Sequence, residues 1–347
     1  MKQNMREAML YEKLPDSRVR CHVCQWECAI APDKLGVCKV RQNREGKLYT
    51  LNYAAVSSAA VDPIEKKPLF HFFPGSQVFS LGGWGCNFHC QDCQNWQIAC
   101  VDGLPSGSQT ILPEAAIEAT RSHHCAGIAW TYNEPAMWFE YTLDSAKLAR
   151  QNKLYTVYVT NGFLTAEALD IIGPFLDAWR VDIKGFSDDL YRKLAKVSKW
   201  RGILEVAKRA KEKWSMHVEV VTNIIPTMND DEEQLKGIAD WIRNELGELT
   251  PWHVTRFHPH HLMSHLPPTP TSTLERALDI GHKAGLRFVY AGNVPGHPGE
   301  NTVCYSCGNL IIRRQGYQTE LLALRDSHCK FCGADLNIRT GIIERCD

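Results

Sequence analysis

The chain has 347 residues, in which 39 lysines and arginines balance 39 aspartates and glutamates. This length fits one large domain with appendages or two domains, and zero net charge does not favour a nucleic-acid partner. Hydrophobic residues are 44% of the chain and charged residues 22%, which is typical of a globular protein and excludes general disorder. The start of the chain lacks the apolar run of a secretory signal, and nothing reaches the ~18 apolar residues of a membrane span, so we expect a cytoplasmic protein.

Cysteine is the unusual residue, with 14 copies. Disulfides are rare in the cytoplasm, so this number points to metal binding. Eleven cysteines form three groups with short spacings. The other three, Cys100, Cys125 and Cys346, are interpreted as small apolar residues.

The first group reads C-x2-C-x3-C-x9-C and consists of Cys21, Cys24, Cys28 and Cys38. Four thiolates can complete the coordination of a metal, which indicates a closed, structural site. The spacing suits zinc and also suits an iron–sulfur cluster. The pattern leaves these two alternatives open.

Between residues 77 and 291, short apolar runs alternate with helical patterns. Pro113 marks a helix start, and capping boxes are predicted at Asp230 to Glu233 and at Ser272 to Glu275. Gly247 and Gly285 are predicted to end helices. Such alternation predicts right-handed βαβ units and a parallel sheet. The predicted strands are 78–82, 127–131, 154–159, 179–183, 217–224, 253–257 and 286–290.

The second cysteine group directly follows the first of these strands. Cys86, Cys90 and Cys93 form C-x3-C-x2-C without an obvious fourth cysteine. Three ligands leave one iron of a [4Fe–4S] cluster free to bind a substrate, as the open position of a catalytic zinc does. Trp84 and Trp96 flank this loop, and we expect them to exclude water and oxygen from the cluster.

The third group lies near the C-terminus and comprises Cys304, Cys307, Cys329 and Cys332. Each Cys-x-x-Cys pair is followed by a glycine, which tolerates a positive φ in a tight turn. Two strand-like runs, 310–313 and 320–324, lie between the pairs and suit a hairpin. This arrangement predicts a zinc-ribbon-like segment and favours zinc over rubredoxin-like iron.

The C-x3-C-x2-C loop resembles the signature of the radical S-adenosylmethionine (SAM) superfamily. Longer strings resemble the radical SAM enzymes of the AmmeMemoRadiSam system, relatives of the pyruvate formate-lyase activating enzymes. These strings are DPIEKKPLFHFFPGS at 62–76, CQNW at 93–96, TYNEP at 131–135 and GNVPG at 292–296. One departure is Asp92, which stands where the family has an aromatic residue.

The resemblance implies a partial (β/α)6 TIM-type barrel over residues 61–300. It also implies an N-terminal four-cysteine segment over 1–60 and a zinc-ribbon-like segment over 301–347. A [4Fe–4S] cluster on Cys86, Cys90 and Cys93 would bind SAM. The chemistry of such barrels lies at the C-terminal ends of the strands.

The same resemblance implies which side chains contact SAM. Glu134 would bind the amino group of SAM, although Tyr132 and Asn133 replace the two glycines of the family motif. Two of the implied contacts have a purely structural alternative. Asn161 could form an Asx turn, and Asp182 could form a salt bridge with Lys184. The implied SAM contacts are Glu134, Asn161, Asp182, Lys184 and His258.

By this resemblance, the protein reductively cleaves SAM to a 5′-deoxyadenosyl radical that abstracts hydrogen from an unidentified substrate. One alternative is an activase that forms a glycyl radical on a partner protein. A second alternative is a non-catalytic zinc-ribbon or iron–sulfur adaptor. We expect an electron donor such as flavodoxin or ferredoxin and a possible protein substrate, with no membrane or nucleic-acid partner.

Overall fold

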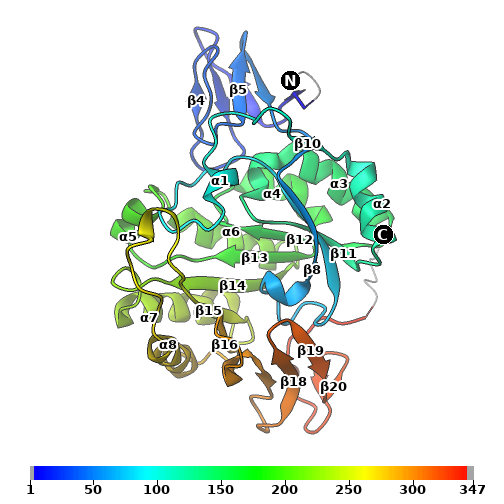
Figure 1. Cartoon of the computed structure of the whole chain (residues 1–347), viewed down its shortest axis with the longest axis vertical. Coiled ribbons are helices and arrows are strands. Elements are labelled where there is room, and N and C mark those ends of the chain that lie inside the picture. The colour runs from blue at the N-terminus through cyan, green and yellow to red at the C-terminus, as the bar shows by residue number, and fades with distance from the viewer. Residues whose placement is uncertain (1–3, 342–347) are drawn as a thin grey trace. The chain divides into compact units, whose positions relative to one another are not determined.

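The computed structural model describes residues 4–341 (Figure 1). The chain forms two compact units. The first contains the chain up to Asp62 together with Gln77–Trp179 and Leu194–Met216. The second contains Pro63–Ser76, Arg180–Lys193 and the chain from His217 onward. The boundaries that the sequence predicts at residues 60 and 300 stay predictions.

The first unit contains parallel strands covered by helices. Strand β11 pairs in parallel with β9 on one side and with β12 on the other, and β8 neighbours β9. Every residue of β11 is buried, as expected for a parallel strand covered on both faces. The strands are β8 (Ser58–Pro63), β9 (Gln77–Gly82), β11 (Gly127–Trp130) and β12 (Tyr155–Thr160).

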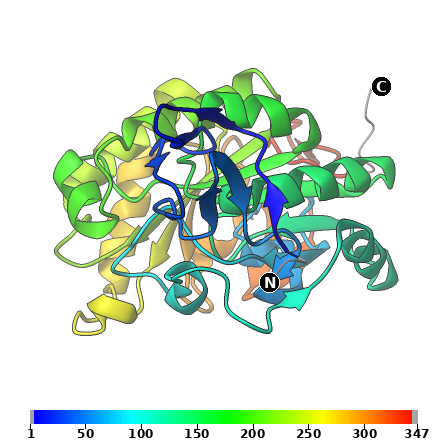
Figure 2. The same ribbon diagram turned by 90° about the horizontal axis from the view of Figure 1, so that it is seen from above.

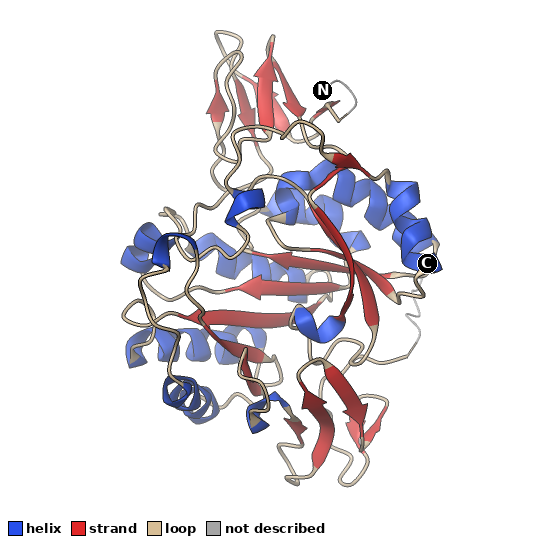
Figure 3. Ribbon diagram, in the orientation of Figure 1, coloured by secondary structure: helices blue, strands red, loops and turns tan. Residues whose placement is uncertain are grey.

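The helices of the first unit, which are among those drawn in blue in Figure 3, have buried apolar residues at helical spacing, as α6 illustrates. In α6, the buried residues Ile203, Val206, Ala207 and Ala210 recur at helical spacing and form one apolar face. The helix predicted to start at Pro113 is confirmed as α2. The helices are α1 (Trp96–Ala99), α2 (Pro113–Ser122), α3 (Phe139–Gln151), α4 (Ala166–Ile172) and α6 (Arg201–Glu212), with 3-10 turns η2 (Pro135–Trp138) and η3 (Gly173–Phe175).

The N-terminal part of the first unit consists of short antiparallel strands (dark blue in Figure 2). One sheet has the order β1-β6-β5 and a second has the order β2-β3-β4, while β7 pairs with β10. These strands are β1 (Arg6–Glu7), β2 (Tyr11–Lys13), β3 (Val19–Cys21), β4 (Ala29–Ile30), β5 (Arg41–Arg44), β6 (Lys47–Thr50), β7 (Ala55–Val56) and β10 (Gln109–Thr110). Cys21 is the last residue of β3, and Cys24, Cys28 and Cys38 lie in the segments that connect these strands.

In the second unit, β14 (His217–Ile224), β15 (Trp252–Arg256) and β16 (Val289–Gly292) pair in parallel. Strand β13 (Ala178–Asp182) and α5 (Asp188–Leu194) each carry residues of both units. Helix α7 (Glu232–Trp241) continues into the π-helical turn η4 (Ile242–Leu246), and α8 (Thr271–Lys283) precedes β16. Short 3-10 turns are η1 (Ile64–Lys66), η5 (His261–Met263) and η6 (Pro298–Glu300).

Strands appear at all seven predicted places, but the last begins later than predicted. The Arg287 amide bonds the carbonyl of Glu248, in the segment before β15, and the paired register with β15 starts at Val289 opposite Trp252. Gly247 and Gly285 end their helices at φ values of 89° and 92°, as predicted.

Both predicted capping boxes are wrong. Asp231, not Asp230, caps α7, and its carboxylate accepts from the Gln234 amide. Asp230 instead accepts from the Thr227 amide in the preceding turn. Helix α8 starts at Thr271 after Pro270 with no side-chain cap, and Ser272 lies inside its first turn.

The C-terminal strands form the predicted hairpin, drawn in orange and red in Figure 1. Strands β18 (Leu310–Gln315) and β19 (Gln318–Leu321) pair antiparallel, and β17 (Thr302–Val303) joins them. A second small hairpin pairs β20 (Leu324–Arg325) with β21 (His328–Cys329). Their core also contains Phe70, Phe288 and Tyr290 from elsewhere in the second unit. No helix in the described residues is long and apolar enough to cross a membrane.

Candidate metal centres

The loop with Cys86, Cys90 and Cys93 begins at the C-terminal end of β9, where barrel enzymes place their chemistry. The loop is fixed by its backbone. The Cys93 amide donates to the Cys90 carbonyl at 3.3 Å, and the Gln91 amide donates to the Leu194 carbonyl at 2.9 Å. All three cysteines are partly buried and form no disulfide.

Cys86 is the first thiol of this loop and is partly buried. The Phe88 amide donates to its sulfur at 3.4 Å. Burial raises the pKa of the Cys86 thiol well above its usual value, and the Glu134 carboxylate raises it further. A thiolate at this position therefore needs a bound cation, which is what a metal cluster supplies.

Asparagine side chains fix this loop through hydrogen bonds. Three of them, Asn87, Asn95 and Asn133, were not among the site residues predicted from the sequence. Asn133 donates to the Gly85 carbonyl at 2.7 Å and accepts from the Gly83 amide at 3.1 Å. Asn95 donates to the Tyr132 carbonyl at 2.8 Å. The side-chain oxygen of Asn87 accepts from the side-chain nitrogen of Asn161 at 2.8 Å. The sequence offered one signal for these residues, which is their position in the motifs. Asn87 lies between Cys86 and Cys90, Asn95 lies in CQNW, and Asn133 lies in TYNEP.

Glu134 is almost fully buried. Its carboxylate accepts from the Thr160 hydroxyl at 2.8 Å. It also accepts from the backbone N–H groups of Asn161 at 2.8 Å and Ala136 at 3.1 Å. These bonds tie the end of β12 to the turn after β11. Glu134 thus braces Asn161, and its role toward SAM stays a prediction.

Asn161 forms the Asx turn that was one of its two predicted roles. Its side-chain oxygen accepts from the Phe163 amide at 3.0 Å. Its side-chain nitrogen points to Asn87 and lies 3.9 Å from the Cys86 sulfur. The turn therefore aims an amide N–H at the cysteine loop.

Two buried donors beside the loop have no acceptor in the described part of the chain. They are Asn87 Nδ2 and Trp84 Nε1. Buried polar groups normally have partners, so unused donors next to three thiols fit an anionic iron–sulfur cluster with its bound ligand. Trp96 is 41% exposed and Trp84 is only partly buried, so neither flanking tryptophan is fully buried as a shield would be.

The predicted site residues of the second unit lie at strand ends. The Asp182 carboxylate accepts from the Arg180 guanidinium at 2.7 Å and lies 4.0 Å from the Lys184 ammonium. The predicted salt bridge is thus present, although Arg180 is the nearer partner. His258 is exposed in the loop after β15. The roles of Asp182, Lys184 and His258 toward SAM stay predictions.

The motif at 62–76 enters a buried network of the second unit. The Glu219 carboxylate accepts from the amides of Phe70 and His71, and also from the rings of His217 and His253. The His71 ring contacts the Tyr290 hydroxyl at 2.6 Å and the Leu336 carbonyl at 2.8 Å. These contacts give the motif a structural role.

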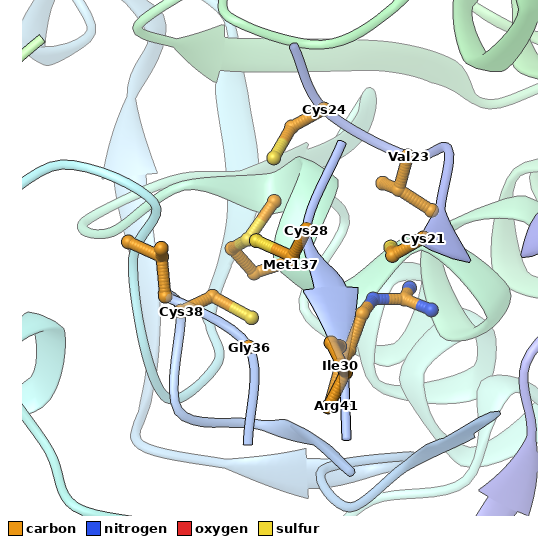
Figure 4. A pocket seen from close by; sticks show the side chains of 10 residues that line it. Cys21, Val23, Cys24, Cys28, Ile30, Gly36, Cys38, Arg41 and Met137 are labelled. Carbon is orange, nitrogen blue, oxygen red and sulfur yellow. The ribbon is translucent and has the colours of Figure 1, made fainter. Parts of the chain in front are cut away.

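The first cysteine group lines one pocket, together with Arg41, Met137 and apolar side chains (Figure 4). Cys21, Cys24 and Cys38 are buried, and Cys28 is partly buried. Burial raises the pKa of all four thiols, that of Cys38 to about 11. The group that the sequence predicts is therefore assembled in space.

The third group has the tightest geometry. The sulfur atoms of Cys304, Cys307, Cys329 and Cys332 all lie within 4.8 Å of one another. Cys304 and Cys332 are 3.6 Å apart, and Cys307 and Cys329 are 3.7 Å apart. A hydrogen bond from Asn309 lowers the pKa of Cys307 to about 6, whereas burial raises that of Cys304 to about 12.

The two knuckles of this group have the predicted backbone. Gly308 and Gly333 have φ values of 72° and 74°. Their amides donate to the carbonyls of Cys304 and Cys329 at 2.9 Å. Both turns are therefore built in the same way, and the four thiols form a metal-binding group.

A family model described as the radical SAM superfamily matches residues 83–242. This span starts at the end of β9 and includes Cys86, Cys90 and Cys93. The chain belongs to the radical SAM superfamily. Like other radical SAM proteins, it is an enzyme, and its substrate is not identified by this membership.

Comparison with known proteins places this radical SAM chain beside two relatives and one solved structure. It is 44% identical to the uncharacterized protein MJ0808 of Methanocaldococcus jannaschii over 338 residues, covering 96% of this chain and 99% of that protein. It is 25% identical to the pyruvate formate-lyase-activating enzyme of Clostridium pasteurianum. That match covers 49% of this chain and 72% of that enzyme. A domain of a pyruvate-formate lyase-activating enzyme from Bacteroides vulgatus matches with a TM-score of 0.41 and 16% identity, covering 48% and 99%.

Proposed function

We propose that this radical SAM enzyme binds SAM at a [4Fe–4S] cluster held by Cys86, Cys90 and Cys93. When bound, the cluster supplies the electron that cleaves SAM to a 5′-deoxyadenosyl radical, which abstracts hydrogen from the substrate. The observation that carries this proposal is the three-thiol loop at the end of a parallel strand. The unused donors of Asn87 and Trp84 beside that loop support it.

The chain's own residues would position the reactants. Asn161 directs an amide toward Cys86, and Glu134 holds the backbone of Asn161. We propose that Glu134, Asn161, Asp182, Lys184 and His258 contact SAM, as the family resemblance implies. We also propose the partial (β/α)6 barrel with its two appended metal segments and a cytoplasmic location. The thirteen described cysteines are all free of disulfides, which supports that location.

The decisive experiment measures 5′-deoxyadenosine after anaerobic reconstitution with iron and sulfide and addition of SAM and dithionite. The wild type is expected to release 5′-deoxyadenosine, and the triple variant Cys86→Ala, Cys90→Ala, Cys93→Ala is expected to release none. Cys125→Ala is a matched control, because Cys125 is a buried cysteine of the same unit outside the three groups. Equal product from the wild type and the triple variant would refute the proposal and favour a non-catalytic adaptor.

A second candidate function is the activation of a partner protein through a glycyl radical. The named activating enzymes among its relatives favour this candidate. It requires a protein substrate and a one-electron donor such as flavodoxin or ferredoxin. The test is electron paramagnetic resonance of a co-encoded candidate partner after incubation with the enzyme and SAM. A glycyl radical signal supports activation, and 5′-deoxyadenosine without that signal argues for another substrate.

We also propose that the third cysteine group binds zinc. Thiolates at about 2.3 Å from one zinc ion in a tetrahedron stand roughly 3.8 Å apart. The separations of 3.6 and 3.7 Å support a single ion. Rubredoxin-like iron needs similar geometry, so metal analysis of the purified protein distinguishes the two.

A further inference from the structure

The first and third cysteine groups differ in how far apart their sulfur atoms lie. Among the residues that the structure describes, only the third group has ligand atoms that all lie within 4.8 Å of one another. Cys21, Cys24, Cys28 and Cys38 instead surround an open pocket. One zinc ion holds four sulfurs at roughly 3.8 Å, whereas the sulfurs of this first group do not all lie within 4.8 Å of one another. A cubane cluster binds each thiolate to a different iron and therefore spreads the sulfurs farther apart.

The pocket also carries an unused donor. Arg41 lines it beside Cys21, and its side chain is 2% exposed (Figure 4). Its two terminal nitrogens donate to the Glu140 carboxylate at 3.0 and 2.8 Å. Its Nε has no acceptor in the described part of the chain. A buried N–H facing thiols fits an anionic sulfur acceptor, which a cluster provides.

Backbone amides are directed at the cysteine sulfurs of this pocket as well. The amides of Val23, Trp26 and Val40, each two residues after a cysteine, favour the thiolate form of Cys21, Cys24 and Cys38, and the Val37 amide favours that of Cys28. Such N–H groups stabilise thiolates and tune the potential of a cluster.

The pocket lies next to the loop that carries Cys86. The Cys38 carbonyl oxygen would be 2.6 Å from a Cβ on Gly85. The Trp26 amide favours the thiolate form of Cys24, and the Trp26 indole donates to the Asn87 carbonyl at 2.8 Å. One tryptophan therefore connects a ligand of the pocket to the residue after Cys86.

We infer that the pocket of Cys21, Cys24, Cys28 and Cys38 holds a [4Fe–4S] cluster that passes single electrons to the site at Cys86, Cys90 and Cys93. The transfer rests on the proposed function, whereas the identity of the cluster does not. Each step moves one electron from the reduced cluster of the pocket to the second cluster, with no bond formed or broken. A low-potential donor such as ferredoxin or flavodoxin returns the electron to the pocket.

Metal analysis of the full-length, anaerobically reconstituted protein tests the identity of this cluster. We expect about eight iron atoms and eight sulfides per chain, with one zinc in the third group. Two zinc ions with about four iron atoms would overturn the inference. This measurement needs no variant and is independent of SAM cleavage.

Variants locate the cluster. The triple variant Cys86→Ala, Cys90→Ala, Cys93→Ala is expected to keep half of the iron and to give a reduced-cluster signal in electron paramagnetic resonance. Loss of all iron from that folded variant would overturn the inference. The double variant Cys24→Ala, Cys38→Ala is expected to lose the half of the iron that the triple variant keeps. Cys125→Ala is expected to keep all of its iron.

The magnetic interaction between the clusters tests their proximity. The spectrum of the reduced wild type is expected to be broader than the sum of the two single-cluster variants. A spectrum equal to that sum would refute electron transfer between neighbouring clusters. If both clusters form but no 5′-deoxyadenosine is released, the proposed function fails while the cluster assignment stands. If 5′-deoxyadenosine forms with only half of the expected iron, the proposed function stands and the inference fails.

Discussion

Gly85 lies against the carbonyl oxygen of Cys38, so the first and second cysteine groups, from distant parts of the sequence, meet at a glycine. Its φ is 84°, and a Cβ there would be 2.6 Å from that oxygen and 2.8 Å from the Val40 side chain. Both the backbone conformation and the lack of space require glycine.

Gly85→Ala is therefore expected to disturb both loops and to lower the iron content of the reconstituted protein. Gly107→Ala is the matched control, because Gly107 has a φ of 79° but nothing within 4 Å of an added Cβ. The iron content per chain is measured for both variants. Both variants strain the backbone, but only Gly85→Ala adds a steric clash, so the difference in iron content reports the clash. Equal iron in the two variants would show that the contact with Cys38 has no role.

Asn161→Ala is expected to lower the rate of 5′-deoxyadenosine formation by about 10- to 100-fold, the usual cost of removing a group that orients metal ligands. The reason is that Asn161 bonds Asn87 and approaches the Cys86 sulfur. Asn152→Ala, at an exposed asparagine after α3, is expected to leave the rate unchanged. An Asn161→Ala enzyme with the wild-type rate would remove this residue from the site.

The buried His71 makes stability depend on pH. Burial lowers the pKa of His71 from 6.5 to about 3, because the folded protein keeps the ring neutral. Below pH 6.5 the unfolded chain binds a proton that the folded chain does not. The free energy of unfolding therefore falls as the pH drops from 6.5 toward 3, by up to about 1.4 kcal/mol per pH unit.

Urea unfolding at pH 7.5 and pH 5 measures this effect. His71→Gln is expected to be less stable than the wild type at pH 7.5 and to lose less stability on acidification. His258→Gln, at an exposed histidine, is expected to retain the full wild-type loss. The same pH dependence in His71→Gln and wild type would contradict the assignment.

Removal of the metal from the third cysteine group is expected to destabilise the C-terminal strands. Cys304 and Cys329 belong to the same core as Ile311 and Ile312, so thiolates without a cation would lie inside apolar surroundings. Cys329→Ser is expected to lose one zinc per chain and to lower the melting temperature. Cys346→Ser, outside the three groups, controls for cysteine loss; an unchanged zinc content in Cys329→Ser would exclude this site.

Much of the fold could be predicted from the sequence because its signals are local. Parallel strands such as β11 read as short apolar runs, and the two cysteine knuckles combine fixed spacing with a glycine. The cap of α7 was wrong by one residue, since Asp230 and Asp231 carry the same chemistry and only the chain geometry selects between them.

The rest depends on contacts between distant segments, which spacing does not encode. The bond between Asn87 and Asn161 joins two loops, and the pairing of Arg41 with Glu140 joins a strand to a helix. The Glu219 network likewise gathers residues from three segments. Polar residues of these types usually lie at the surface, so the sequence gives no sign of their burial.

The core shared by Phe70 and Ile311 has a consequence for the order of folding during synthesis. Phe70 leaves the ribosome long before the strands that cover it. At about 5–20 residues per second, that interval is roughly 10 to 50 s. During this time its apolar surface stays open to chaperones, and the second unit reaches its native packing only when the third cysteine group has been made.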